Sequence, residues 1–238
     1  MTFDSLGDRM KLYEAATDVA LVPRCPVIIR IDGKGFHNWT RGLDRPFDAG
    51  LVETMGEVAK VLCEEMQTTQ LAYLQSDEIS LLLHGYRRHE SQPLFGNRLQ
   101  KLCSVAASIA AAELTVRYGR VAYFDARAFV VPEAEVTNYF LWRQNDASRN
   151  SIQMLARSLA SHKECDGLGQ AELNELCFSR GKNWNDLPTR LKRGRCITRR
   201  SYQIGDVTRH AWEADDEIPV WKAEGRDYIE RLLTTEGE

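Results

Sequence analysis

A short apolar run that ends in an acidic turn is the feature that most limits how this chain can fold. Residues 27–31 are valine and isoleucine except for Arg30, and Asp32-Gly33 interrupts them. β-branched residues favour a buried strand, and the aspartate–glycine pair favours a turn. A carboxylate at the end of such a strand is held rigidly, which suits a metal ligand. Aspartate in a turn equally serves to accept backbone hydrogen bonds, so this segment alone leaves both interpretations open.

The elements expected around this strand alternate between helix and strand. Apolar periodicity and turn signals predict, in chain order, a helix over 3–20, a strand over 26–32, a helix over 48–67, a hairpin over 70–83, a helix over 97–117, a strand over 121–131 and a long helix over 134–161. The β-α-β order predicts that the run 71–74 lies parallel and adjacent to the first strand. The aromatics Tyr139 and Trp142 are expected to pack in the core.

The tip of the predicted hairpin is acidic, because Ser76-Asp77-Glu78 separates its two apolar runs. Acidic tips are common on protein surfaces. If the runs 26–32 and 79–83 are antiparallel neighbours, however, Asp32 and Asp77 converge from separate loops. Two carboxylates with open positions suit Mg²⁺, which keeps several waters and is completed by substrate phosphates. Two ions held in this way would activate an attacking hydroxyl and stabilise a leaving pyrophosphate.

Composition narrows the class of protein. A chain of 238 residues with 43% hydrophobic residues predicts one large domain, or one domain with an appendage. No membrane span or signal peptide is expected. The six cysteines are scattered without a C-x-x-C pair, which favours free thiols in a reducing cytoplasm over a zinc site or disulfides. The net charge of −3 conceals a basic cluster over 190–200, which fits either a phosphate-contacting surface or a solvated face.

Two motifs taken together carry a family resemblance. Arg30-Ile-Asp-Gly-Lys-Gly-Phe-His37 and Gln75-Ser-Asp-Glu-Ile-Ser80 resemble the signature pair R-x-D-G-R-x-F-H and Q-S-D-E-Y-S of the tRNA-His guanylyltransferase family, in which about 40 residues separate the two. The resemblance continues through Phe124-Asp-Ala-Arg127, Trp142-Arg-Gln-Asn-Asp146, Asn174-Glu-Leu-Cys-Phe178 and Leu187-Pro-Thr-Arg-Leu-Lys-Arg-Gly194. It covers most of the chain and thins after about residue 200.

The resemblance implies an α+β, two-layer fold with a polymerase-like palm, whose antiparallel or mixed sheet carries packed helices. The palm would occupy residues 1–135. A mainly helical, basic extension over 136–238, continuous with the palm, would contact RNA. The implied enzyme adds nucleotides in the 3′-5′ direction: ATP adenylylates a tRNA 5′-monophosphate, and the 3′-hydroxyl of an incoming nucleotide displaces AMP. Positioning and charge neutralisation would dominate such phosphoryl transfers.

The resemblance also implies roles for individual residues. Asp32, Asp77 and Glu78 match catalytic acids, and two or more Mg²⁺ ions would be held by Asp32, Asp77 and the carbonyl of Gly33. Contacts to ATP or GTP are implied for Arg30, Lys34, Gly35, Phe36, His37, Arg45, Ser76, Arg98 and Lys101. RNA contacts are expected for Arg127, Asn150, Lys182, Lys192, Arg193 and Arg195. Without the motif match, Arg98 and Lys101 would fit a solvated helix end. Strand alternation does not decide which face of the sheet Arg127 lies on.

One segment departs from the family pattern. Eukaryotic tRNA-His enzymes carry H-I-N-N-L-Y-N where this chain has Ser148-Arg-Asn-Ser-Ile-Gln-Met154. The chain therefore resembles the bacterial and archaeal guanylyltransferase-like branch, whose members favour template-directed repair of 5′-truncated tRNAs. Addition of guanosine to tRNA-His is the alternative, and a palm-type nucleotide cyclase or a non-catalytic RNA-binding protein are more distant ones. A homo-oligomer, tetrameric by family resemblance, is expected in the cytoplasm.

Overall fold

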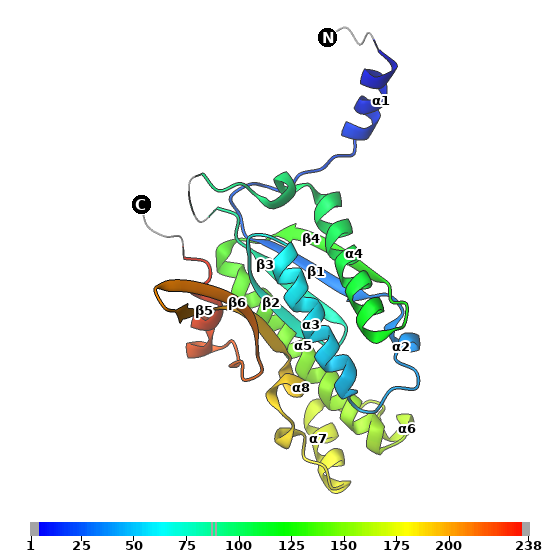
Figure 1. The fold of residues 1–238 in the computed structure, drawn as a ribbon. Helices are drawn as coiled ribbons and strands as arrows, with labels where there is room; N and C mark the ends of the chain where they lie inside the picture. The colour runs from blue at the N-terminus through cyan, green and yellow to red at the C-terminus, as the bar shows by residue number, and fades with distance from the viewer. Residues whose placement is uncertain (1–4, 87, 89, 235–238) are drawn as a thin grey trace.

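A six-stranded sheet forms the centre of the molecule (Figure 1). The computed structural model describes residues 5–86, 88 and 90–234. The strands are β1 (Val27–Gly33), β2 (Thr69–Gln75), β3 (Glu78–Leu83), β4 (Phe124–Val130), β5 (Arg195–Ile204) and β6 (Val207–Asp215). Their order is β4-β1-β3-β2-β5-β6, and every neighbouring pair is antiparallel. The predicted α+β fold is confirmed.

The position of β3 confirms one prediction and corrects another. β1 and β3 are antiparallel neighbours, with Ile31 opposite Ile79, as expected. β1 and β2 run parallel, but β3 lies between them, so the predicted adjacency is wrong. The physical reason is burial: the residues of β3 from Ile79 to Leu83 are buried on both faces, which is typical of a central strand.

Two long helices cover one face of the sheet. They are α3 (Ala49–Glu65) and α4 (Leu99–Tyr118), close to the predicted spans. α3 begins at the cap residue Asp48, whose side chain accepts a hydrogen bond of 2.7 Å from the Leu51 amide. Buried residues four apart on α4 pack on the same core as the odd-numbered isoleucines of β1. Among the described helices, α4 alone is long and apolar enough to cross a membrane by length and composition.

A 27-residue helix, α5 (Glu133–Leu159), lies on the other face. Its first half packs on Ile28, Tyr73 and Leu82, and the fully buried Trp221 closes this second core. The second half extends beyond the sheet, where further helices pack on it (Figure 1). These are α6 (His162–Cys165), α7 (Gln170–Ser179) and α8 (Thr189–Arg193). The extension is therefore helical, as predicted, as far as α8.

The hairpin formed by β5 and β6 was not predicted. β5 pairs with β2 from Arg195 to Thr198, so the sheet of the palm continues into the C-terminal part of the chain. Beyond Thr198 the hairpin is mostly exposed. The many charged residues of this segment hide the strand pattern, because neither face of an exposed hairpin needs apolar side chains.

The remaining elements are short. They are α1 (Leu6–Ala15), α2 (Phe36–Trp39), α9 (Asp227–Glu230) and the 3₁₀ turns Leu94–Asn97, Trp184–Asp186 and Ala223–Arg226. α1 is shorter than the predicted helix over 3–20 and projects from the body of the molecule (Figure 1). No residue of α1 is buried, and its apolar residues Leu6 and Tyr13 are 65% and 73% exposed. All six cysteines are free thiols, as expected.

Candidate nucleotidyl-transfer site

The end of β1 and the turn between β2 and β3 bring two carboxylates together. Ile31 lies in the core beneath α3 and α4, so strand alternation turns Arg30 and Asp32 to the opposite face, towards α5. The pairing of Ile31 with Ile79 places Asp32 beside the hairpin turn that carries Asp77. A methyl group on the α-carbon of Gly33 would lie only 2.8 Å from Asp77 Oδ2. The Asp77 carboxylate therefore packs against the residue that follows Asp32, near enough to Asp32 for the two charges to interact.

Burial and repulsion by a neighbouring carboxylate make both carboxylates of this pair harder to ionise. Burial raises the pKa of Asp77 to about 6, and the charge of Asp32 adds to the effect. Burial also raises the pKa of Asp32, as does Asp125, against the opposing effect of Arg30. Within the described residues, neither Asp32 nor Asp77 forms an ion pair within 4 Å. A divalent cation would relieve this repulsion.

The donor set indicates which cation fits. The described part of the chain holds no group of three or more histidine, cysteine, aspartate or glutamate side chains placed to bind a metal ion. The donors that the motifs predict are the carboxylates of Asp32 and Asp77 and the Gly33 carbonyl, and this set stays a prediction. Mg²⁺ typically takes one or two protein carboxylates and completes its shell with waters and phosphates, so this sparse oxygen set fits Mg²⁺.

Gly33 is predicted to be intolerant of any side chain. In Gly33→Ala the new methyl would lie 2.2 Å from Phe36 Cδ2, and that ring is buried and stacked on Trp39 at 4.8 Å. Because the ring has little room to move, the Asp77 carboxylate is displaced. We expect a loss of about 1–3 kcal/mol in unfolding free energy and a higher Mg²⁺ requirement for activity. Thermal melts and Mg²⁺ titrations measure both. Gly7→Ala, on the exposed α1, serves as control, and unchanged behaviour of Gly33→Ala would contradict the prediction.

A pocket of about 410 Å³ opens beside Asp77. Its volume lies in the range of small-molecule sites. Its walls come from four parts of the chain, with Ser76 and Asp77 at the hairpin turn. The residues that the wall shares with the predicted nucleotide contacts and catalytic acids are Phe36, His37, Arg45, Ser76 and Asp77. On α5, Asn150 lines this pocket together with Met154 and Arg157, whereas the sequence had assigned Asn150 to RNA.

Lys34 and Gly35 form the turn between β1 and α2 and are both exposed. Gly35 has a φ of 67°, in the left-handed region, where glycine carries no steric cost. The Lys34 amide donates to the Tyr123 carbonyl at 2.8 Å, which ties the turn to the segment before β4. Neither residue is part of the pocket lining. Their predicted contacts with nucleotide therefore stay predictions.

Arg98 and Lys101 lie at the wrong end of α4 to contact the pocket. Arg98 pairs with Asp18 at 3.2 Å, near the N-terminal arm. The opposite end of α4 approaches the site, where the Tyr118 ring lies 5.1 Å from that of Trp39. A 20-residue helix spans about 30 Å, so these two cations cannot reach a nucleotide in the pocket of the same chain. Helical periodicity reports a shared face but not which end approaches the site.

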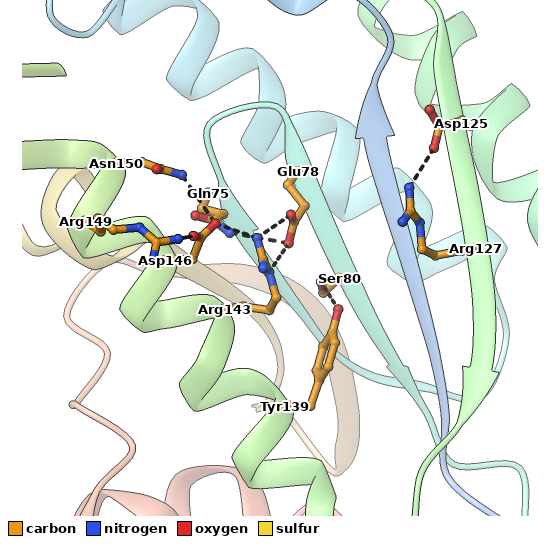
Figure 2. A network of polar contacts seen from close by, with 10 residues as sticks. All are labelled: Gln75, Glu78, Ser80, Asp125, Arg127, Tyr139, Arg143, Asp146, Arg149 and Asn150. Atoms are coloured by element: carbon orange, nitrogen blue, oxygen red, sulfur yellow. Dashed lines mark hydrogen bonds and ion pairs between the residues drawn. The ribbon is translucent and has the colours of Figure 1, made fainter. Parts of the chain in front are cut away.

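Arg143, which was not among the predicted site residues, holds the Glu78 carboxylate. Arg143 Nε and Nη2 donate to the two Glu78 oxygens, each at 2.7 Å (Figure 2). Arg143 also bonds Asp146 at 2.8 Å, and its side chain is only 7% exposed. Through these bonds Glu78 ties the hairpin turn to α5. The role of Glu78 as a catalytic acid stays a prediction.

The residues predicted to contact RNA differ in how much of each side chain is exposed. Arg127 is exposed on β4, opposite Arg30 in the strand pairing and therefore on the Asp32 face. Lys182 is exposed, whereas Lys192 and Arg193 are half-buried and donate to backbone carbonyls. Arg195 is a correction: its side chain is 6% exposed and pairs with acids of α3 and of the segment after β6. Arg195 therefore braces the fold, and the little surface that it exposes lines the pocket.

Trp142 also differs from expectation. Its side chain was predicted to be core, yet Trp142 is 53% exposed, while Tyr139 on the same helix is buried. Helical spacing cannot show which of the two is buried, because residues three apart lie on neighbouring parts of the same helix face. Asp125 was likewise missed as a site neighbour; it lies opposite Asp32 on β4. The motif Phe124-Asp-Ala-Arg127 was its only sequence signal.

Comparison with known proteins identifies the family. A family model described as tRNA-His guanylyltransferase matches residues 7–132, more than half of the chain. A curated tRNA(His) guanylyltransferase of Debaryomyces hansenii is 31% identical over 204 residues, which cover 75% of each protein. This chain belongs to the tRNA-His guanylyltransferase family. A probable tRNA(His) guanylyltransferase of Drosophila melanogaster is 28% identical over 216 residues, or 82% of this chain and 74% of that protein.

Solved structures of the family share the fold. A bacterial tRNA(His) guanylyltransferase (Thg1)-like protein in complex with ATP matches with a TM-score of 0.90 and 42% identity, covering 98% of this chain and 100% of that one. The tRNA(His) guanylyltransferase of Saccharomyces cerevisiae matches with a TM-score of 0.68 and 25% identity, covering 79% and 91%. This member of the family is accordingly a guanylyltransferase-like nucleotidyltransferase, as its motifs predicted.

Proposed function

We propose that this protein is a 3′-5′ nucleotidyltransferase that repairs the 5′ ends of truncated tRNAs, using nucleoside triphosphates, Mg²⁺ and the opposing strand as template. The observation that carries the proposal is the placement of Asp77 in the wall of a nucleotide-sized pocket, with Gly33, which follows Asp32, packed against its carboxylate. Repair is supported by the 42% identity to bacterial Thg1-like proteins in complex with ATP and with GTP. The segment 148–154, which departs from the tRNA-His pattern, supplies part of the pocket wall.

The chain's own residues divide the work of transfer. His37, Arg45 and Ser76 line the pocket and would hold the triphosphate and base of ATP or GTP. Arg30 and Arg127 lie beside Asp32 and favour a phosphate of the RNA end. Mg²⁺ held by Asp32, Asp77 and the Gly33 carbonyl would neutralise the phosphates and lower the pKa of the attacking hydroxyl.

The proposed reaction proceeds in two phosphoryl transfers. The tRNA 5′-monophosphate attacks the α-phosphorus of ATP, so that a 5′-adenylylated end forms and pyrophosphate leaves. The 3′-hydroxyl of the incoming nucleotide then attacks the 5′-terminal phosphorus, loses its proton and displaces AMP. In both steps the pocket would position the nucleotide, and Arg30 and Arg127 would position the RNA 5′ end.

Addition of a single guanosine to tRNA-His is a second candidate. It is favoured by the curated relatives, a tRNA(His) guanylyltransferase of the yeast Debaryomyces hansenii and a probable one of the fruit fly. The same carboxylates and pocket serve both reactions, since the two differ in the RNA that is presented and not in the bond that forms. Substrate comparison therefore separates them.

The test presents three RNAs to the protein with Mg²⁺ and all four triphosphates. A tRNA that lacks its first 5′ nucleotide is expected to gain the nucleotide complementary to the opposing base, and a changed opposing base should change the product. Full-length tRNA-His should be extended far more slowly, and EDTA should abolish every product. Preferred guanosine addition to tRNA-His would support the second candidate. Turnover of free triphosphate without an RNA product would indicate a cyclase, and absence of any extension would overturn the proposal.

We further propose that the protein works in the cytoplasm as a homotetramer. The six free thiols support a reducing compartment. The exposed apolar side chains of α1 support self-association, because a helix without buried residues gains stability when a partner covers it. Light scattering at micromolar concentration measures the oligomeric state.

A further inference from the structure

We propose that Trp142 is a stacking platform for a nucleobase at the 5′ end of the RNA substrate. This inference rests on the proposed function and adds to it a base contact on the catalytic face. The starting observation is exposure. Trp142 is 53% exposed, although its helix buries most of its other apolar side chains that face the sheet. A large aromatic side chain left open to solvent beside a catalytic site favours a ligand contact.

The indole is held firmly from its own helix. The Tyr139 ring meets it edge-on at 5.9 Å, and the Arg143 guanidinium lies 4.4 Å from its centroid. Both supports are themselves fixed to β3: the Tyr139 hydroxyl and Ser80 Oγ are 2.8 Å apart, and Arg143 holds Glu78 (Figure 2). The platform is therefore braced by the strand that follows Asp77. A ring that is already ordered loses little entropy when a base stacks on it.

The charges near Trp142 suit a nucleic acid backbone. The Arg30 guanidinium lies 5.7 Å from the centre of the indole. Arg30 is directly opposite Arg127 in the pairing of β1 with β4, and the Arg127 side chain is 53% exposed. Like charges directly opposite each other in a sheet repel, and Asp125 offsets Arg127 only through an exposed contact of 3.5 Å, so this pair favours an anion such as a phosphate. Proteins usually bind single-stranded nucleic acid in this way: cationic side chains contact the phosphates, and an aromatic ring stacks on a base.

The position of Trp142 favours RNA over the bound triphosphate. The pocket beside Asp77 is lined by later turns of α5, including Asn150, and Trp142 is not part of its lining. Asn150 lies eight positions after Trp142 on the helix, which is about 12 Å along the helix axis. The triphosphate and the RNA end would thus approach the carboxylates from different sides.

Kinetics test the platform with three variants. Trp142→Ala is expected to raise the KM for the truncated tRNA about tenfold or more, with a smaller change in kcat, whereas Trp142→Phe keeps an aromatic face and should stay near wild type. Phe178→Ala removes an aromatic that is 67% exposed on α7 and serves as the matched control. An unchanged KM for Trp142→Ala, or equal losses in the alanine and phenylalanine variants, would overturn the inference.

Fluorescence provides a readout that needs no turnover. The probe is an acceptor-stem RNA with a 5′-monophosphate, added without triphosphates. The protein has five tryptophans, so the signal of Trp142 is taken as the difference between wild type and Trp142→Phe. RNA should quench this difference signal, and an abasic 5′-terminal nucleotide should abolish the quenching. Quenching by ATP or GTP alone would overturn the assignment to RNA, as would full quenching by the abasic RNA. Absence of extension by wild type alongside base-dependent quenching would instead count against the proposed reaction only.

Discussion

Asparagine in place of Asp77 is expected to reduce nucleotide transfer by about a thousandfold while it makes the metal-free protein more stable. The catalytic loss follows from the removal of one of the two charges that would hold Mg²⁺, a larger effect than the 10- to 100-fold typical of residues that only support a ligand. The gain in stability follows from the pKa of Asp77, which burial raises from 3.8 to about 6. Ionisation therefore costs the folded state free energy that a neutral amide does not.

The sign and the pH window follow from the same pKa. Below pH 3.8, Asp77 is protonated in the folded and unfolded states alike, so it costs no stability. Between pH 3.8 and about 6 the unfolded state ionises first, and stability falls as the pH rises. Above pH 6 the full cost applies, about 1–3 kcal/mol after allowance for solvent screening. In EDTA at pH 7.5 we therefore expect Asp77→Asn to melt at a higher temperature than wild type, and at pH 4 the two should converge.

Magnesium should reverse the order of stability. Wild type gains stability as Mg²⁺ binds the folded state, and the Asp77→Asn protein gains little. Asp32→Asn is expected to behave in the same direction, since burial and Asp125 also raise the pKa of Asp32. A melting temperature of Asp77→Asn in EDTA at pH 7.5 at or below that of wild type would contradict this account. So would near-normal transfer by either variant.

Loss of Arg143 is expected to cost about 3–5 kcal/mol of unfolding free energy. In Arg143→Ala the Glu78 carboxylate, only 12% exposed, would lose both of its 2.7 Å hydrogen bonds, and the 16% exposed Asp146 would keep only the exposed Arg149 as an ion-pair partner. A buried charge without a partner is far more costly than the pair it came from. Urea denaturation measures the loss, and activity should fall as well, because Glu78 adjoins Asp77.

Two further proteins test whether the unpaired charge is the cause. Arg149→Ala removes an arginine that pairs with the same Asp146 but is 58% exposed, so its cost should stay below about 1 kcal/mol. In the double variant Glu78→Gln with Arg143→Met, most of the loss should be recovered because fewer buried charges lack a partner. Equal losses of unfolding free energy in Arg143→Ala and Arg149→Ala would show that the unpaired buried charge of Glu78 is not the cause.

Several site residues could be predicted because their signals are local. The β-branched run before Asp32 and the apolar runs around Asp77 specify strands and a turn by themselves. The cap residue Asp48 and the periodic residues after it specify α3 in the same way. Once two such strands are known to be antiparallel neighbours, the meeting of their ends follows from the register.

The sequence by itself thus determined the strands β1 to β4, the acidic turns, the main helices and the two aspartates, whose motifs also indicated the family. Only the tertiary structure decided that β3 separates β1 from β2, that Glu78 belongs to Arg143, and that Arg195 is buried among acids. It also decided which end of α4 approaches the site and that Trp142 stays open to solvent. The reason is physical: periodicity reports which residues share a face, whereas exposure and charge pairing depend on partners distant in the chain.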